Sequence, residues 1–248
     1  MPITASRRLC IFFASGTTHY AVEAVSVLEV ARPGSDDELT QRHLWLRDLT
    51  LLLGGEPEVR PGAALILDTS PTMAIRVREV EGVFDTSKDP ELPLSNRLIS
   101  LLAPAVSRAL VHEDAVVFEL DAQASTRGLP RQTRRPELAT IEPTTQCLVF
   151  QSGTARLAIP LPRVLQVIAL GPRFNHAPGS GSFRGVLGRE RQLCPVFCIS
   201  DALELEPFIV LFELGGEILG LTAARAEGVK PPDSLGEVRV LDLERMFS

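Results

Sequence analysis

The sequence contains few aromatic residues and almost no lysine. Only 5 % of its 248 residues are Phe, Trp or Tyr, and Lys88 and Lys230 are the two lysines among 25 basic residues. Acidic residues are in excess, and the formal net charge at pH 7 is −6. A surface that binds nucleic acid or an anionic membrane needs concentrated positive charge. The composition therefore argues against both classes of partner.

Long apolar runs are missing as well. No run approaches the roughly 20 residues that a membrane-spanning helix needs. The N-terminal segment RRLCIFFASG resembles a signal peptide in its two arginines, but its apolar stretch is too short for one. We predict the first β-strand of the fold at this point and expect a cytoplasmic protein.

The four cysteines do not form a recognisable metal or disulfide pattern. Cys10 and Cys147 occupy equivalent positions among apolar neighbours, and the Cys-x3-Cys spacing of Cys194 and Cys198 lacks two further ligands. A free cysteine among apolar residues behaves as a small hydrophobic side chain. We therefore expect four core residues, no metal site and no cofactor.

An internal repeat is the most informative feature that is present. The segment CIFFASGTTHYAVEAVSVLEV, Cys10–Val30, matches CLVFQSGTARLAIPLPRVLQV, Cys147–Val167, at nine positions with an offset of 137 residues. Background composition gives roughly one or two matches in such a window. Further on, MAIRVREVEGV matches LGLTAARAEGV with an offset of 146, and the two share Glu-Gly-Val. The chain thus contains two related halves.

The two halves differ by insertions in different places. Around FNHAPGSGSFRGVLGRERQLCPV the second half is longer by 13 residues, and towards its end it is shorter by 25. Between the halves, residues 122–145 lack hydrophobic periodicity and carry three prolines and four arginines. We read this segment as a solvated linker, although its arginines could also dock an acidic partner. It separates modules at residues 8–121 and 146–248.

Each half reads as a series of short strands. Valine and leucine occur in alternating or short continuous runs bounded by Gly, Pro, Ser and Asp. The Ser-Gly-Thr tripeptides at Ser15 and Ser152 indicate hairpin turns, and the stretches after Asp48 and Pro93 indicate short helices. The sequence therefore predicts an all-β protein with a few short helices.

The order of the motifs resembles the CheW family of chemotaxis adaptor domains. The segments YAVEAVSVLEV and LAIPLPRVLQV are similar to its early strand, GVLGRERQLCPVFCI to its Gly-Val and Pro-Val stretch, and VLDLERMF to its closing motif. The resemblance implies two CheW-like modules, each a pair of small five-stranded SH3-like barrels. It also implies a non-enzymatic adaptor that couples chemoreceptors to a CheA-type histidine kinase, or alternatively a regulator that caps those contacts.

The same resemblance implies the partners and the binding residues. The partners would be the kinase regulatory domain, the cytoplasmic tip of chemoreceptors and, as a further candidate, other CheW-like proteins, at membrane-associated receptor arrays. Alternation places Val27 with Glu29, and Val164 with Gln166, on one face of a strand, where filling the core is an equal alternative. The family Arg-Gly pair aligns with a charged run that could also be a solvated hairpin. The candidate partner-binding residues are Val27, Glu29, Val164, Gln166, Arg189, Glu190 and Arg191.

The motifs do not assemble an enzyme site. His19 and His112 are expected in solvated loops or turns, and Trp45 is expected to fill the core. The GSGSFRG segment, Gly179–Gly185, lacks the Gly-Lys-Ser/Thr ending of a phosphate loop. The acidic run Asp36–Glu38 follows Pro and Gly in a predicted loop. We therefore predict that the protein is not an enzyme.

Overall fold

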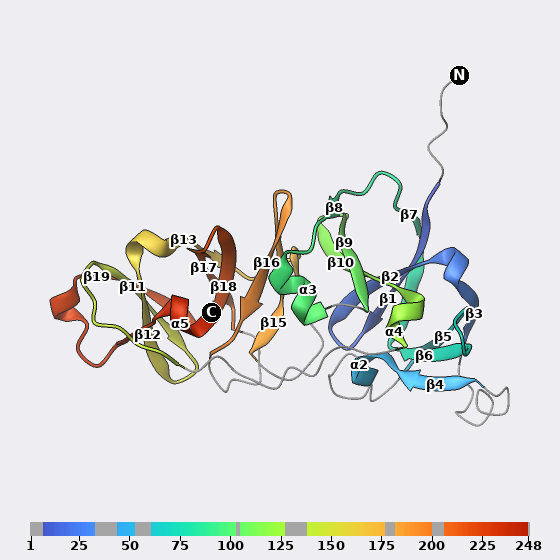
Figure 1. Ribbon diagram of the computed structural model, residues 1–248, viewed down its shortest axis with the longest axis horizontal. Helices are drawn as coiled ribbons and strands as arrows, with labels where there is room; N and C mark the ends of the chain where they lie inside the picture. Colours follow the sequence, from blue (N-terminus) through green and yellow to red (C-terminus); the bar gives the residue numbers. More distant parts are fainter. Residues whose placement is uncertain are drawn as a thin grey trace, which may run out of the picture. The chain divides into compact units, whose positions relative to one another are not determined.

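The structure is a computed structural model that divides into two compact units. It describes residues 7–32, 44–52, 61–102, 105–126, 138–176, 182–199 and 206–247. The first unit is Met1–Gln132 with Pro172–Ser180 and Gly188–Leu193, and the second is Thr133–Gly171 with Gly181–Leu187 and Cys194–Ser248. Both consist mainly of short strands with few, short helices (Figure 1), which confirms the predicted all-β, two-module fold.

Two sheets lie entirely within the first unit. One has the order β7-β1-β2-β10-β9-β8 and the other the order β3-β5-β6-β4, and β1 contacts β6. The strands of the larger sheet are β1 (Leu9–Ser15), β2 (Thr18–Glu23), β7 (Glu79–Asp85), β8 (Glu91–Leu92), β9 (Val106–His112) and β10 (Ala115–Leu120). Those of the smaller sheet are β3 (Val27–Ala31), β4 (Trp45–Asp48), β5 (Ala63–Leu67) and β6 (Met73–Val77). The helices are η1 (Ala24–Ser26), α2 (Leu49–Leu52), α3 (Asn96–Leu102) and α4 (Ala122–Ser125).

The remaining strands form a four-stranded and a six-stranded sheet, with the orders β19-β11-β12-β20 and β13-β17-β18-β16-β15-β14. The four-stranded sheet consists of β11 (Cys147–Ser152), β12 (Ala155–Pro160), β19 (Arg225–Lys230) and β20 (Arg239–Val240). The six-stranded sheet consists of β13 (Val164–Ala169), β14 (Phe174–His176), β15 (Phe183–Arg189), β16 (Gln192–Phe197), β17 (Phe208–Leu214) and β18 (Glu217–Ala223). The helices are η2 (Leu161–Arg163), η3 (Pro232–Ser234) and α5 (Leu243–Phe247).

The two halves of the sequence share one pairing order. The order β7-β1-β2-β10 corresponds to β19-β11-β12-β20, and the order β3-β5-β6-β4 corresponds to β13-β17-β18-β16. The strands β9 and β8 continue the first order beyond β10, and β15 and β14 continue the last order beyond β16. The insertions seen in the sequence are therefore additional strands at the edge of a shared four-stranded arrangement.

The repeated Ser-Gly-Thr turns close equivalent hairpins. Gly16 and Gly153 have φ angles of 58° and 56°, in the left-handed region that glycine adopts at little steric cost. The turn residues follow the paired positions Ser15↔Thr18 in one hairpin and Ser152↔Ala155 in the other. The predicted hairpins are confirmed in both halves.

The cores contain the side chains that the apolar runs predict. In the first unit Phe13 stacks on Tyr20 with ring centroids 5.7 Å apart, and burial raises the pKa of the Tyr20 phenol. In the second unit Phe247 packs between Phe197 and Phe212. All four cysteines are buried, which confirms that they pack in the core: Cys10, Cys147, Cys194 and Cys198.

Two sequence expectations in the first unit are wrong. Trp45 is 49 % exposed on β4, with the Arg47 guanidinium 4.9 Å from its ring centroid, so it does not fill the core. His112 is not in a solvated turn. It ends β9 and packs against the Phe12 ring, and its Nδ1 forms a hydrogen bond of 2.7 Å with Asp89 Oδ2.

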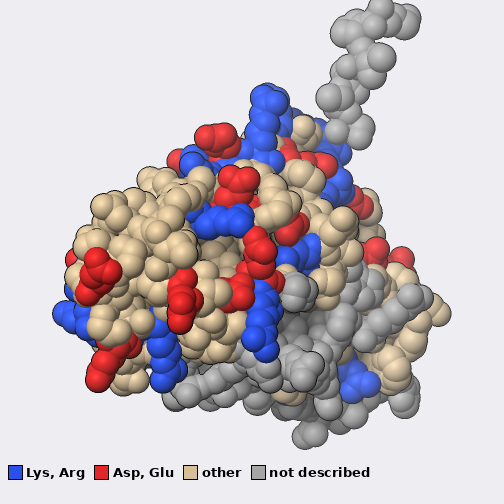
Figure 2. All heavy atoms as spheres, turned by 60° about the vertical axis from the view of Figure 1, so that its left-hand side comes forward, with Lys and Arg blue, Asp and Glu red and all other residues tan. Residues whose placement is uncertain are grey.

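The surface carries charge of both signs. On the face shown in Figure 2, Lys and Arg side chains are interspersed with Asp and Glu side chains. Among the described residues, no helix is both long and apolar enough to cross a membrane. The helix α4 begins inside the predicted linker, while residues 127–137, with all four linker arginines, lie outside the described residues, so the linker and the module boundaries stay predictions.

Candidate functional site

The strands β3 and β13 are edge strands with the same irregularity. In β3, Val27 pairs with Leu67 and Glu29 pairs with Ile66, so Leu28 is an extra residue with no position opposite it on β5. Such an extra residue is a β-bulge, which bends and twists an edge strand. Leu28 is 59 % exposed. The bulge therefore presents a leucine to solvent at the open edge of the sheet.

The second half repeats this arrangement. In β13, Val164 pairs with Phe212 and Gln166 pairs with Leu211, so Leu165 is the extra residue. Leu165 is 43 % exposed and matches Leu28 in the sequence repeat. We call Leu28 and Leu165 the bulged leucines.

The bulges correct an expectation from the sequence. Leu67 and Ile66 are neighbours on β5 and so point to opposite faces of the sheet, and their partners Val27 and Glu29 do the same. The expectation that Val27 and Glu29 face the same side is wrong, because it assumed unbroken alternation. The same correction applies to Val164 and Gln166 in the second half.

The edge strand of the first unit carries further exposed apolar side chains. Val30 on β3 is exposed, and Val25 in the preceding turn η1 is 85 % exposed. Exposed apolar side chains along an open sheet edge are typical of a contact surface or of an aggregation site. The sequence did contain a signal for the bulged leucines, since Leu28 and Leu165 are among the nine identities of the repeat. The candidate residues Val27 and Val164 are half-buried beside them, and Glu29 and Gln166 are exposed.

The shared Glu-Gly-Val motif forms a second repeated bulge. In β7 the partners of Phe13 and Phe12 are Val80 and Gly82, so Glu81 is the extra residue, and in β19 Glu227 is the extra residue by the same pairing. The glycines have positive φ angles, 155° at Gly82 and 104° at Gly228. The motif therefore encodes a bent edge strand in each half.

The bulged glutamates bind equivalent positions across the sheet. The Glu81 carboxylate lies 2.7 Å from His19 Nδ1, and the Glu227 carboxylate accepts a hydrogen bond of 2.7 Å from Arg156. His19 and Arg156 are matched by the repeat, so the contact with the bulged glutamate is kept while its partner changes from histidine to arginine. The Arg156 hydrogen bond lowers the pKa of Glu227, and the carboxylate raises the pKa of Arg156.

The charged run at the other candidate site forms a turn. Arg189 ends β15, Arg191 precedes β16, and Glu190 between them has a φ of 52°. Glu190 and Arg191 are exposed, whereas Arg189 is half-buried. The candidate residues therefore lie at separate places, on β3, on β13 and in this hairpin turn. Their role in binding partners stays a prediction.

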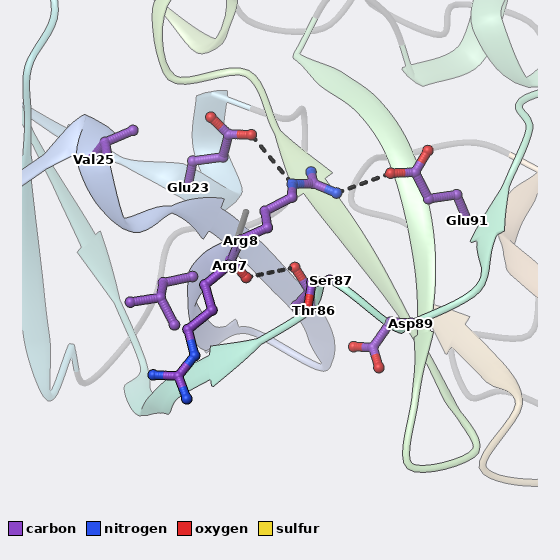
Figure 3. Close-up of a pocket in the computed structure, with 9 residues that line it drawn as sticks. Arg7, Arg8, Glu23, Val25, Thr86, Ser87, Asp89 and Glu91 are labelled. Carbon is purple, nitrogen blue, oxygen red and sulfur yellow. Dashed lines mark hydrogen bonds and ion pairs between the residues drawn. The ribbon is translucent and has the colours of Figure 1, made fainter. Parts of the chain in front are cut away.

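A polar cleft in the first unit was not foreseen (Figure 3). Its volume is about 570 Å³, and its floor carries the Arg8 guanidinium, which donates to Glu23 at 3.3 Å and to Glu91 at 2.9 Å. Arg8 also binds Glu119, whose side chain is only 4 % exposed and is bound by Arg108 as well. The cleft is lined by Arg7, Arg8, Leu9, Glu23, Val25, Thr86, Ser87, Asp89 and Glu91.

Neither half brings together a metal site in the part of the chain that the structure describes, where no group of three His, Cys, Asp or Glu side chains could hold an ion. Asp36–Glu38, His43 and part of the GSGSFRG segment lie outside the described residues.

Comparison with known proteins gives a similarity in structure but none in sequence. No protein-family model matches the chain, and no curated protein sequence matches it. Among solved structures, it is similar to the crystal structure of the scaffolding protein TtCheW from Thermoanaerobacter tengcongensis, with a TM-score of 0.31 and 15 % sequence identity. The similarity covers 35 % of this chain and 64 % of that one.

Proposed function

We propose that the protein is a non-enzymatic adaptor of the CheW type that couples chemoreceptors to a CheA-type histidine kinase. The observation that carries the proposal is the pair of bulged leucines, which place an exposed apolar side chain at the same point of two related edge strands. The order of CheW-like motifs in both halves of the sequence supports the same conclusion.

The proposed mechanism needs only surfaces. An adaptor holds its partners by apolar contacts rimmed with polar groups, and two such surfaces on one chain bind a multivalent partner more tightly than either alone. The bulged leucines would supply the apolar contacts. The exposed Glu29 and Gln166 beside them, and the hairpin turn Arg189–Arg191, would supply polar ones.

We infer the partners from the family resemblance. They are the regulatory domain of the kinase, the cytoplasmic tip of chemoreceptors and other CheW-like proteins, in the cytoplasm at receptor arrays. Residues 8–121 and 146–248 would be the two CheW-like modules, joined by the Arg-rich linker.

The test is a reconstitution with the purified full chain, the kinase of the same organism and a fragment of its chemoreceptor. We expect the chain to sediment with receptor and kinase together and to increase receptor-dependent kinase autophosphorylation. Binding accompanied by a decrease in autophosphorylation would favour the capping regulator instead. A chain that binds neither protein would contradict both versions of the proposal.

A further inference from the structure

A charged cluster at the polar cleft, of which Arg8, Glu23 and Glu91 line the cleft, holds more carboxylates than cations. Arg8 and Arg108 both contact Glu23, Glu91 and Glu119, and the Arg108 distances are 3.4, 2.8 and 3.0 Å. Two guanidinium groups thus face three carboxylates. We call these five side chains the Arg–Glu cluster. It carries one unit of negative charge that is not balanced within it.

The neighbouring charged groups do not supply the missing cation. The Asp89 carboxylate, which also lines the cleft, forms a hydrogen bond of 2.7 Å with His112 Nδ1. Arg7 at the rim lies 3.6 Å from Asp85, so its charge is offset by that carboxylate. The excess negative charge of the Arg–Glu cluster is therefore not balanced by these neighbours of the cleft.

The fold does not require this cluster. By the offsets of the repeat, Arg8, Glu23 and Glu119 correspond to Thr145, Pro160 and Val240 in the second half. There the four-stranded sheet has the same order, and its core is apolar around Cys147, Val149 and Val240. Since ion pairs stabilise a fold little compared with apolar packing, whether they are exposed or buried, the cluster in the first unit calls for another explanation.

The cluster still has acceptors for a ligand. Both arginines use the Oε1 atom of Glu23 and the Oε1 atom of Glu91, and among the described residues neither Oε2 atom receives a hydrogen bond. Glu91 is exposed and Glu23 half-buried, and both side chains line the cleft. Figure 3 shows the two carboxylates on either side of the Arg8 guanidinium. A carboxylate with a vacant oxygen prefers a cationic donor.

The rim of the cleft is apolar at two points. Val25 is 85 % exposed and Leu9 is also exposed. An amphipathic ligand, with a cationic end and an aliphatic stem or neighbour, would cover both.

We propose that the polar cleft binds a lysine or arginine side chain of a partner protein, inserted between Glu23 and Glu91, with an adjacent apolar residue packed on Val25 and Leu9. The inserted cation completes the charge balance of the Arg–Glu cluster. This assignment rests on the proposed function in one respect, that the occupant is a protein segment. It adds a contact in the first unit for which the second half has no counterpart.

The experiment titrates the full chain with labelled synthetic peptides of a common frame around Leu-Arg-Leu, in which Arg is kept or replaced by Lys, Gln or Glu. We expect the Arg and Lys peptides to bind at least about tenfold more tightly than the Gln and Glu peptides, with an affinity that falls as salt is raised. Equal binding of all four peptides, or no binding of the cationic ones, would overturn the proposal.

Two variants locate the binding. Val25→Arg changes a side chain that is already in solvent and places a competing positive charge at the rim. It should therefore reduce the affinity for the Arg peptide by about tenfold or more. Glu91→Gln should weaken it by about fivefold. The matched controls Ile141→Arg and Glu244→Gln, which make the same changes at exposed sites of the second unit, should leave binding unchanged. Equal effects of variants and controls would place the peptide elsewhere and refute the site.

The peptide titration contains neither receptor nor kinase, so its outcome is independent of the reconstitution. Binding of the cationic peptide in the cleft without binding of the kinase would support the site and contradict the proposed function. Binding of the kinase without binding of the peptide would support the proposed function and contradict the site.

Discussion

The glutamate of each Glu-Gly-Val bulge makes a surface contact whose partner residue differs between the two halves. His19 faces Glu81 in the first unit and Arg156 faces Glu227 in the second. Arg225 and Lys230 also lie within 4 Å of Glu227, at 3.5 and 3.7 Å. A guanidinium stays charged at any pH a protein survives. The pH dependence of the contact between Arg156 and Glu227 therefore comes from the carboxylate.

The lowered pKa of Glu227 makes a prediction at this scale. A carboxyl whose folded-state pKa lies below its unfolded value adds stability above the ordinary glutamate pKa of about 4.3, and that contribution is lost as the pH falls through the folded-state pKa. The thermal midpoint of wild type should therefore exceed that of Glu227→Gln near pH 7, and the difference should shrink towards pH 3. Arg156→Gln removes the cation instead and serves as the reciprocal control. A difference that does not change with pH would contradict the prediction.

At the scale of the element, the bulges decide which side chains the edge strands present. A regular β3 would place Leu28 on the face opposite Val27 and Glu29, and the extra residue breaks that alternation. Because bulges twist an edge and interrupt its ladder, they also hinder uncontrolled strand pairing there. A partner would therefore bind the exposed leucines through side-chain contacts and not by adding a strand to the sheet.

Substituting the bulged leucines should separate binding from stability. Leu28→Asp and Leu165→Asp change exposed side chains, so the free energy of unfolding should move by no more than about 0.5 kcal/mol. Each should weaken sedimentation with receptor and kinase, because a charge replaces an apolar contact that must be desolvated. The control Ile99→Asp introduces the same charge at an exposed site on α3. A control as damaging as the two variants would argue against the edge strands as contact surfaces.

The sequence was sufficient for features that depend on local chemistry. The hairpins follow from glycine at a turn, and the buried cysteines from their apolar neighbours. The bulges could not be predicted, since alternation assumes one residue opposite each residue, and only the partner strand reveals the extra one. Trp45 was misplaced because large aromatic residues are usually buried.

The polar cleft could not be predicted for a different reason. Arg8 and Glu119 are 111 positions apart in the sequence, and no local sequence pattern around either residue predicts an ion pair. The CheW resemblance did not help either, because the cluster is absent from the matching positions of the second half. Long-range pairing of charged side chains needs the folded sheet that brings their strands together.

At the scale of the whole molecule, one four-stranded arrangement is used twice in each half and extended differently. The strands β8 and β9 extend it beyond β10, while β14 and β15 extend it beyond β16. An edge accepts an added strand without changing the pairs already formed, which explains why the insertions lie there. The two halves keep their bulged edges and differ in the strands around them.

Two equivalent edges in one chain make a prediction about binding to an array. If both bulged leucines contact one multivalent assembly, the second contact is intramolecular and raises the overall affinity by about 10² or more. Each single variant, Leu28→Asp or Leu165→Asp, should then sediment more weakly with receptor and kinase. The double variant should not sediment with them at the same concentration. A double variant that sediments like the weaker single variant would show that only one edge is engaged.

The shared pairing order also affects how the chain folds. The hairpin β11–β12 lies between β19 and β20 as the hairpin β1–β2 lies between β7 and β10, and the two hairpins have similar turns. During synthesis each hairpin can therefore meet the wrong sheet, and tandem copies of one fold are prone to such strand exchange. Charged and polar residues that only one half contains, such as Arg8 and Glu119 against Thr145 and Val240, penalise the exchanged pairing by leaving a buried charge without its partner. The sequence differences between the copies thus disfavour pairing of a strand with the sheet of the other half.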